Sequence, residues 1–212
     1  MKTETTRVRV RCSTKGASLL RIILTGLVAA LIPTGIQGAD QESVSIILPK
    51  TDDVVLNFAA QDLGRYLKQM TGEPIDIGNP GAKHHIYLGA VPSSASAADA
   101  EQLRGEVAKL REDGFIIHSV GPSIVILGKG RRGDLYGCYA LLELQGARWF
   151  FPGKQFEIVP HHALDWKTPL NVSDSPTFPK RILFYWPNNY SGVVDWIDFS
   201  AKIRLNRMAF HY

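Results

Sequence analysis

The stretch Gly133-Asp-Leu-Tyr-Gly-Cys-Tyr-Ala-Leu-Leu-Glu-Leu-Gln-Gly146 carries the pattern from which the rest of the fold is predicted. Asp134 is a candidate N-cap, and Gly146 lies just past the predicted end of a helix. The apolar and aromatic positions cover most of its circumference: Tyr136, Tyr139, Leu141, Leu142 and Leu144. A helix of this kind is buried. We therefore expect it at the centre of the core, with Cys138 as an unreactive buried thiol.

A second helix and several short strands are predicted before this stretch. Asn57 is a candidate N-cap for an amphipathic helix that continues to about Met70 and ends before Gly72. A polar stretch at 97–111 predicts a surface helix. β-rich apolar runs predict strands at 44–48, 75–77, 85–88, 115–120, 124–127 and 157–160. The predicted fold class is therefore α/β, a mixed β-sheet with two main helices packed on it.

The composition changes after Leu170. Residues 171–180 are rich in Ser, Thr, Asp and Pro, which predicts a linker after an α/β domain at 40–170. Residues 181–212 then contain an apolar run, an amphipathic stretch and a second apolar run, which is the order and size of one βαβ unit. One such unit cannot cover both faces of a parallel sheet. We therefore expect the chain to be a fragment.

The first 39 residues are predicted to be a secretory signal peptide, which places the protein in a secreted or periplasmic location. Six basic residues and one acid accompany an apolar run, Leu19–Pro33, that is too short to span a bilayer, and small residues follow at Gly38 and Ala39. Removing this segment takes six of 24 basic and one of 20 acidic residues, leaving 18 against 19. A net charge near −1 argues against a nucleic-acid partner. Cleavage would also remove Cys12 and leave Cys138 without a disulfide partner, and no membrane span would remain.

Two motifs are open to a functional reading that we do not favour. Gly128-Lys-Gly-Arg-Arg-Gly133 follows a strand and opens a helix, as dinucleotide-binding loops do, but the acid expected at the end of the next strand is missing. The pairs His84-His85 and His161-His162 could suggest a metal. Neighbouring residues on a strand point to opposite faces, so they cannot readily bind one ion. We therefore predict a tight loop, polar strand edges, no metal and no cofactor.

The opening stretch, continued by Ala-Arg-Trp-Phe-Phe-Pro-Gly153, resembles the second helix of the N-terminal domain of α-glucuronidases. The same domain type precedes the barrel in β-hexosaminidases. Asp62-Leu-Gly-Arg-Tyr-Leu-Lys-Gln-Met-Thr-Gly72 resembles the first helix of that domain, and Asp113-Gly-Phe-Ile-Ile resembles its central hairpin. The resemblance covers about residues 44–160. The whole is most similar to an uncharacterised bacterial glycoside-hydrolase-like family.

This resemblance implies that residues 181–212 begin a (β/α)₈ barrel, truncated here. Phe178-Pro-Lys-Arg181 resembles the barrel entry of β-hexosaminidases, in which an Arg binds sugar hydroxyls, so Arg181 is a candidate substrate-binding residue. An ion pair that ties the linker to the barrel is the alternative for Arg181. The first strand ends in Tyr185-Trp186, where hexosaminidases have an acid. This difference argues against a hexosaminidase substrate.

Barrel enzymes place their sites at the carboxyl ends of the strands. The remaining candidate substrate-binding residues follow from this rule: Trp186, Asn188, Asn189, Tyr190, His211 and Tyr212. Glycoside hydrolysis normally needs two carboxylates, and no convincing pair is present. Asp195 and Asp198 are expected on a solvated helix face. In the resembling families the catalytic acids come from later strands, so no catalytic residue is assigned.

Two functions follow as hypotheses. The first is the N-terminal, non-catalytic part of an exported glycoside hydrolase that acts on polysaccharide or oligosaccharide bonds, inactive alone. The second is a stand-alone carbohydrate-binding or envelope interaction module. Exposed aromatic residues on the sheet face opposite the two main helices would favour the second, and the sequence leaves open which face Tyr87 and Phe115 occupy.

Overall fold

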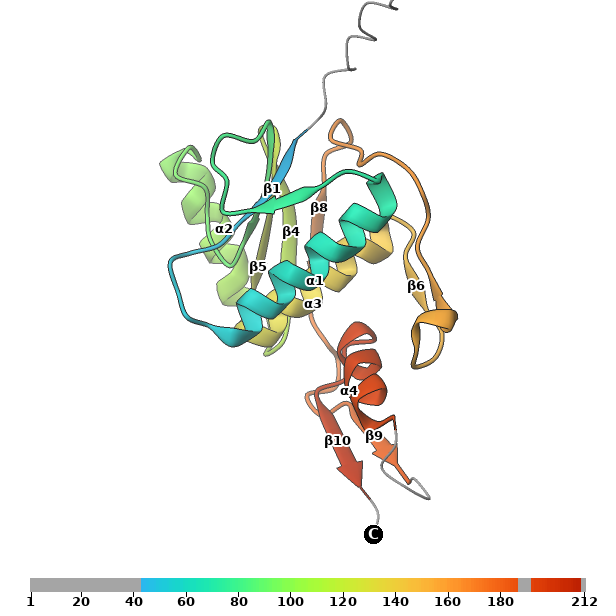
Figure 1. Ribbon diagram of the computed structural model, residues 1–212. Coiled ribbons are helices and arrows are strands. Elements are labelled where there is room, and N and C mark those ends of the chain that lie inside the picture. The colour runs from blue at the N-terminus through green and yellow to red at the C-terminus, as the bar shows by residue number, and fades with distance from the viewer. Residues whose placement is uncertain (1–42, 187–191, 211–212) are drawn as a thin grey trace, which may run out of the picture. The chain divides into compact units, whose positions relative to one another are not determined.

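The structure is a computed structural model that describes residues 43–186 and 192–210 (Figure 1). The predicted signal peptide lies outside the described residues. So do five of the candidate binding residues: Asn188, Asn189, Tyr190, His211 and Tyr212. No helix in the described ranges is both long and apolar enough to cross a membrane.

A six-stranded mixed sheet forms the centre of the α/β domain, in the order β2-β1-β3-β5-β4-β8. Its strands are β1 (Val44–Ile47), β2 (Ile75–Ile77), β3 (His84–Leu88), β4 (Phe115–Val120), β5 (Ser123–Gly128) and β8 (Asn171–Asp174). The first three strands and β5 are parallel, whereas β4 runs antiparallel to both of its neighbours. The predicted mixed sheet is confirmed, and so is the β4–β5 hairpin.

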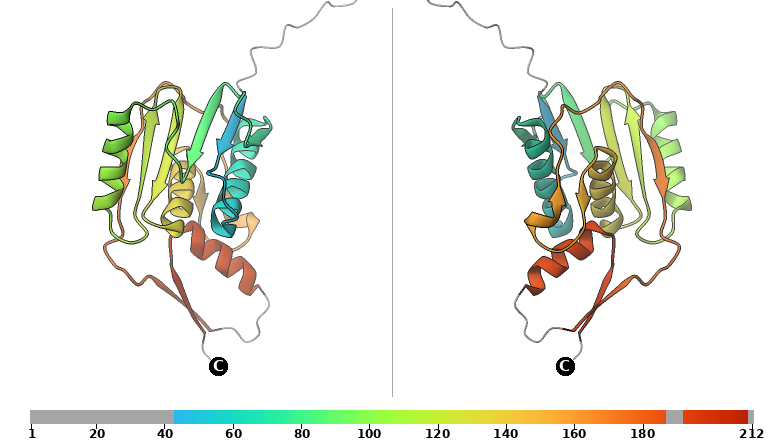
Figure 2. Two further views of the ribbon diagram at one scale, coloured as in Figure 1. Left: turned by 90° about the vertical axis from the view of Figure 1, so that its left-hand side faces the viewer. Right: turned by 90° about the vertical axis from the view of Figure 1, so that its right-hand side faces the viewer.

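Helices cover both faces of this sheet (Figures 1 and 2). The helices α1 (Val54–Thr71) and α3 (Arg131–Leu144) lie side by side on one face, and α2 (Ala97–Lys109) packs on the other. Alternation along the strands explains the arrangement. Ile126 of β5 packs under α1 and α3, and its neighbours Val125 and Leu127 pack under α2. The prediction that this strand is covered on both faces is confirmed.

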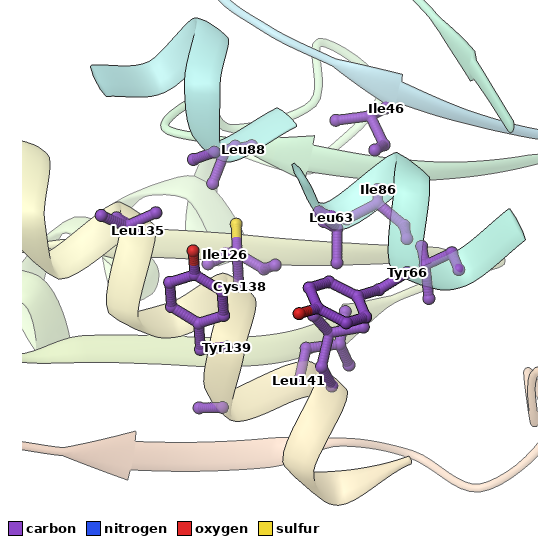
Figure 3. Packing of buried hydrophobic residues seen from close by; sticks show 14 of the residues in the cluster. Ile46, Leu63, Tyr66, Ile86, Leu88, Ile126, Leu135, Cys138, Tyr139 and Leu141 are labelled. Atoms are coloured by element: carbon purple, nitrogen blue, oxygen red, sulfur yellow. The ribbon is translucent and has the colours of Figure 1, made fainter. Parts of the chain in front are cut away.

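The helix α3 is the most deeply placed element of the core, as its pattern predicts (Figure 3). Every residue from Gly133 to Leu142 is buried. Leu141 and Tyr139 are fully enclosed among side chains of α1 and the sheet. Burial raises the pKa of the Cys138 thiol well above its usual value, so the side chain stays protonated. Cys138 is therefore the unreactive core residue that the sequence predicts.

Both helix starts differ from the sequence prediction. Asp53 caps α1, where its Oδ1 accepts hydrogen bonds from the backbone N–H groups of Val55 (2.9 Å) and Leu56 (3.2 Å), and Asn57 lies one turn inside. The helix α3 begins at Arg131 after Gly130, whose φ of 83° suits glycine. Asp134 is thus in the first turn and is no N-cap. Its Oδ1 accepts from the backbone N–H of Gly128 at 2.7 Å.

The end of the domain also differs from the prediction. Residues 157–160 are not the last strand of the sheet. The short strand β7 (Glu157–Ile158) pairs with β6 (Arg148–Trp149) in a separate ribbon, with the 3₁₀ turn Lys154–Phe156 between them. The predicted linker instead begins with β8, which pairs with β4 from His118↔Asn171 to Phe115↔Asp174. It satisfies backbone groups that β4 would otherwise leave open at the sheet edge.

The C-terminal unit is a parallel βαβ unit, as predicted. It consists of β9 (Ile182–Tyr185), α4 (Val193–Lys202) and β10 (Arg207–Phe210). The two strands pair in register from Ile182↔Arg207 to Tyr185↔Phe210. Both strands therefore end at the same edge, with Trp186 directly after the first.

Candidate functional site

The glycine-rich loop between β5 and α3 is a close-packing device. A Cβ atom added to Gly128 would collide with the backbone of Gly133 and Asp134, one added to Gly133 would meet Gly114 O, and one added to Gly137 would lie 2.5 Å from Ile126 Cγ2. These glycines allow α3 to lie directly against the sheet. The tight-loop interpretation of the motif is therefore supported.

A buried carboxyl group lies next to this loop. Asp134 is 8% exposed, in the first turn of α3. Burial raises the pKa of Asp134 to about 7, a hydrogen bond from the Gly128 N–H opposes that rise, and the negative charge of Asp53 adds to it. Above that pH the negative charge of Asp134 at the start of α3 disfavours a phosphate dianion there.

The paired histidines have structural contacts. His84 stacks on Trp166 with ring centroids 4.3 Å apart and an angle of 12° between the rings. His162 bridges two segments, with its ring nitrogens 2.8 Å from the carbonyl oxygens of Gln145 and Ala163. Those two carbonyls raise the pKa of His162. Within residues 43–186 and 192–210, no three His, Cys, Asp or Glu side chains are grouped to hold a metal ion.

Of the predicted binding residues, the structure describes Arg181 and Trp186. Trp186 follows the carboxyl end of β9, where its side chain is 68% exposed and contacts the ring of Phe184, with centroids 6.3 Å apart. Tyr185 and Phe210 end the two paired strands at the same edge, with ring centroids 6.1 Å apart. The carboxyl edge of the unit thus presents aromatic rings, of which Phe184, Trp186 and Phe210 are exposed to solvent.

Arg181 lies at the other end of β9, away from Trp186. Its Nη2 donates to Asp113 Oδ2 (3.0 Å), its Nε to the carbonyl of Arg204 (2.7 Å) and its Nη1 to the carbonyl of Phe178 (2.9 Å). The guanidinium also lies over the ring of Tyr136, 5.7 Å from its centroid. These contacts favour the ion-pair alternative for Arg181, and its sugar-binding role stays a prediction.

Asp113 is the centre of this network, and the sequence did not single it out as a site residue. It has a φ of 65°. Its Oδ1 accepts from Arg132 Nε (2.8 Å), and its Oδ2 accepts from Asn206 Nδ2 (2.9 Å) as well as from Arg181. Burial opposes ionisation, but the hydrogen bonds from Asn206, Arg132 and Arg181 outweigh it and lower the pKa of Asp113. A carboxylate in this loop therefore holds the residue before β9 and the residue before β10, the points at which both strands of the βαβ unit begin.

Lys202 makes a second connection. Its ammonium is 3% exposed and donates to Glu157 Oε1 (2.6 Å) and to Asp198 Oδ2 (2.5 Å). It also lies 5.4 Å from the ring centroid of Tyr66 in α1, whose hydroxyl accepts from Trp149 Nε1 at 3.0 Å. Burial lowers the pKa of Lys202, but hydrogen bonds to Asp198 and Glu157 raise it well above its usual value. A buried, permanently charged lysine therefore joins α4 to the α/β domain.

The acidic residues of α4 do not behave alike. Asp195 is exposed, as predicted. Asp198 also lies on the helix surface, but its carboxylate is paired with Lys202. The side chain of Asp198 is 40% exposed, and it pairs with Lys202 because a buried cation four residues later needs a counter-charge.

Arg204 makes a third connection, at the turn after α4. It has a φ of 60°, forms an ion pair with Glu143 of α3 and lies 3.4 Å from Asp174 of β8. Beside it, the hydroxyl of Tyr136 donates to the carbonyl of Leu205 at 2.8 Å. We call the three groups around Asp113, Lys202 and Arg204 the anchor network.

The βαβ unit shows apolar side chains to solvent around this network. Those exposed are Ile182, Phe184, Trp186, Val194, Ile197, Ile203 and Phe210. Large exposed apolar patches of soluble proteins mark interaction surfaces. The anchor network holds the βαβ unit against the α/β domain, and these apolar side chains are exposed to solvent.

The sheet face opposite α1 and α3 is no aromatic platform. Phe115 points to the other face and is buried in the main core. Tyr87 is half-buried and packs beside the cluster under α2. Neither ring is displayed for binding a ligand.

Parts of two solved structures share this fold. The fold matches part of a family GH115 4-O-methyl-α-glucuronidase, BtGH115A, with a TM-score of 0.54 at 15% identity over 79% of this chain and 25% of that one. It also matches part of CpGH84D, with a TM-score of 0.53 at 14% identity over 79% and 27%. These matches show that the fold is one that forms part of longer chains.

The chain belongs to the family described as the glycosyl hydrolase family 67 N-terminus, which matches residues 30–141, more than half of its 212 residues. It is similar to an α-glucuronidase of Hypocrea jecorina, at 28% identity over 57% of this chain and 14% of the relative. A probable α-glucuronidase A of Aspergillus clavatus is 24% identical over 82% and 22%. The chain thus spans less than a quarter of the length of these two relatives. The resemblance stated from the sequence is confirmed.

Proposed function

We propose that this chain is the N-terminal, non-catalytic part of an exported glycoside hydrolase. Its α/β domain belongs to a glycoside hydrolase family and carries the first βαβ unit of a (β/α)₈ barrel. In this proposal the catalytic carboxylates come from strands beyond residue 212, and the chain alone is inactive. Trp186 and its neighbours at the carboxyl edge would line the substrate pocket.

The observation that carries the proposal is the combination of anchored and open surfaces on the βαβ unit. The anchor network holds β9 and β10 in one orientation through buried or half-buried charges, whereas their apolar side chains are exposed. A parallel pair with open faces is the arrangement that further strands and helices of a barrel would complete.

The substrate class follows from the relatives. Two similar proteins are named α-glucuronidases, and a protein of similar fold is named a 4-O-methyl-α-glucuronidase. We propose carbohydrate as the substrate and α-glucuronosides as the first linkage to test. The module alternative has less support, because Tyr87 and Phe115 form no binding surface on the sheet.

The test uses the reading frame that continues past residue 212. The longer protein is assayed on an oligosaccharide with an α-linked glucuronic acid and on a β-N-acetylglucosaminide, with the 212-residue chain as the control. We expect hydrolysis of the first substrate by the longer protein only. Hydrolysis by the short chain, or a natural stop codon at this position without barrel-coding sequence after it, would contradict the proposal.

Export has its own test. Residues 1–39 are fused to an alkaline phosphatase lacking its leader, and the matched control replaces Leu24, Leu27 and Leu31 by Asp in the apolar run. We expect phosphatase activity outside the cytoplasm for the first fusion and none for the second. Equal activity of the two fusions would reject the signal peptide.

A further inference from the structure

A cavity of about 690 Å³ lies at one edge of the six-stranded sheet. Its lining residues come from 89–134 and include none of the βαβ unit. The loop after β3 (Gly89–Val91) forms one of its sides, and the end of β5 with the loop that follows it (Gly128–Gly130) forms another. Arg104, Val107 and Ala108 of α2 form the third side, and Asp134 of α3 lies at its base. The volume is within the range of about 300–1,000 Å³ that is usual for small-molecule sites.

The topology explains why the cavity opens at this point. The strands β3 and β5 are parallel neighbours, so both end at the same edge. The chain leaves β3 toward α2 on one face and leaves β5 toward α3 on the other. Connections that depart in opposite directions from adjacent strands leave a crevice outside their carboxyl ends, which is where open α/β sheets bind ligands.

The lining of the cavity combines an apolar wall with charges at two ends. Val91, Val107 and Leu127 supply the wall. Arg104 lies on the α2 side. Its side chain is 65% exposed, and its guanidinium is 4.0 Å from Glu101 Oε2, which is longer than a hydrogen-bonded ion pair, so it can also bind an anion in the cavity. Lys129 lies across the opening and donates to the carbonyl of Ala108 at 2.7 Å.

The base of the cavity presents an acceptor. Asp134 uses Oδ1 for the Gly128 N–H, and its Oδ2 lies beside Gly89, where an added Cβ would be 3.7 Å away. The N–H groups of Gly89 and Gly128 are already hydrogen-bonded, to Ile126 O and Asp134 Oδ1, so the acceptor offered at the base is the carboxyl group itself. A ligand here meets cations at the α2 side, an apolar wall along its length and a hydrogen-bond acceptor at the base.

We propose that this cavity binds a uronic acid residue as a second, non-catalytic sugar site. The carboxylate of the sugar pairs with Arg104 and Lys129, its ring C–H face lies on the apolar wall, and its hydroxyls donate to Asp134. A pyranose ring with one carboxylate fits this distribution, because the cations and the acceptor lie at opposite ends. The choice of a saccharide over another hydroxy acid rests on the proposed function, whereas the requirement for a carboxylate comes from the cavity alone.

The experiment is an NMR titration of the full chain labelled with ¹⁵N. The probe is D-glucuronate, and the backbone amides of Gly89, Gly128 and Gly130 report on the cavity. Glucose tests the need for the carboxylate, lactate tests the need for the sugar ring, and inorganic phosphate tests a simple anion site at the start of α3. We expect saturable shifts of the three glycine amides with glucuronate and at least about tenfold weaker binding of glucose and lactate.

Three variants locate the site. Arg104→Ala removes the cation from the α2 side and is expected to weaken glucuronate binding about tenfold or more. Ala108→Trp fills the cavity from an exposed position and is expected to abolish binding. Lys109→Ala changes the same charge on the same helix at an exposed position outside the lining, so binding should be unchanged.

Several results would overturn the proposal. These are absent shifts at the three glycines, equal binding of glucose or lactate, tighter binding of phosphate, and unchanged binding in Ala108→Trp. The assay measures no hydrolysis, so a negative result leaves the proposed hydrolase function standing. An inactive longer protein would likewise leave a positive titration intact.

Discussion

The α/β domain and the βαβ unit are held in place by different forces. Around α3 the contacts are apolar and closed, and side chains such as Leu141 and Ile126 have no access to solvent. The βαβ unit instead has few buried apolar residues, and charged side chains fix its position at Asp113, Glu157 and Glu143. The comparison indicates that one region is stable through burial, whereas the other is oriented by directional bonds. Hydrogen bonds and ion pairs fix geometry, and apolar contact is non-directional.

Leu141→Ala should have the largest effect, because it opens a cavity in the closed region. A buried Leu→Ala change costs about 2–5 kcal/mol of unfolding free energy. Leu144→Ala on the same helix is the control, since that side chain is 51% exposed. Urea unfolding followed by circular dichroism measures both, and a loss below that of the control would mean that burial around α3 is not what stabilises the domain.

Lys202→Met should have the next largest effect, and a local one. Removing one partner of a buried ion pair costs about 3–5 kcal/mol, and because Asp198 is partly exposed we expect the lower end. Hydrogen exchange should speed up in α4 and β10 before it changes in α1 and α3. The exposed Lys154 provides the control, Lys154→Met. Equal exchange in all helices would show that the unit is not separately anchored.

Arg181 distinguishes orientation from ligand binding. Arg181→Ala leaves Asp113 with Arg132 and Asn206, so we expect a loss of about 1.5–3 kcal/mol, the contribution of a hydrogen bond to a charged group. Arg181→Lys keeps the charge without the fork and should lose less. In the longer enzyme, activity should fall in step with thermal stability. If the variants lose sugar affinity at an unchanged melting temperature, the result would support sugar binding by Arg181 instead.

Asp134 is a buried ionisable residue in the apolar region around α3. Replacing it should give the smallest change in unfolding free energy, and that change should depend on pH. Its pKa rises from 3.8 to about 7 on folding, chiefly through burial, with the carboxylate of Asp53 adding to the rise. The folded state holds a proton that the unfolded state has lost, so stability is greatest below about pH 4 and falls as the pH rises toward 7.

Asp134→Asn removes that dependence and keeps an oxygen for the Gly128 N–H. We expect a gain on the order of 1–2 kcal/mol at pH 8, since the helix N-terminus offsets part of the burial effect, and little change near pH 4. Melting temperatures of both proteins at the two pH values measure the difference. The ion pair between Arg131 and Asp53 is kept in this variant. A gain that is equal at both pH values would exclude the titration of Asp134 as its cause.

The fold was largely predictable where apolar periodicity determines the structure. The helix α3, the β4–β5 hairpin and the parallel βαβ unit all follow from runs whose burial dictates their conformation. The strand β8 was missed because Asn171-Val-Ser-Asp174 lies at a sheet edge, where solvent-facing polar residues show no alternation. The cap at Asp53 was missed because Asn57, a residue type that also caps helices, lies in the first turn of α1.

The candidate site was less predictable, because its geometry depends on contacts between distant parts of the sequence. Nothing local to Arg181 identifies Asp113 as its partner, and nothing local to Lys202 identifies Glu157. The signal that could have found Asp113 is its place before Gly114 in the segment that resembles the central hairpin of the α-glucuronidase domain. A lysine at the end of an amphipathic helix, followed by an apolar strand, gave no sign of burial.

The parallel pairing of β9 and β10 has a practical consequence for handling the protein. In the described part of the chain, these strands form a two-stranded sheet that carries the exposed side chains of Phe184 and Ile182. Exposed apolar side chains on so short a sheet promote association with other molecules. Purified alone, the chain should therefore form larger particles as its concentration increases, and a Lys at Phe184 should slow their growth in light scattering.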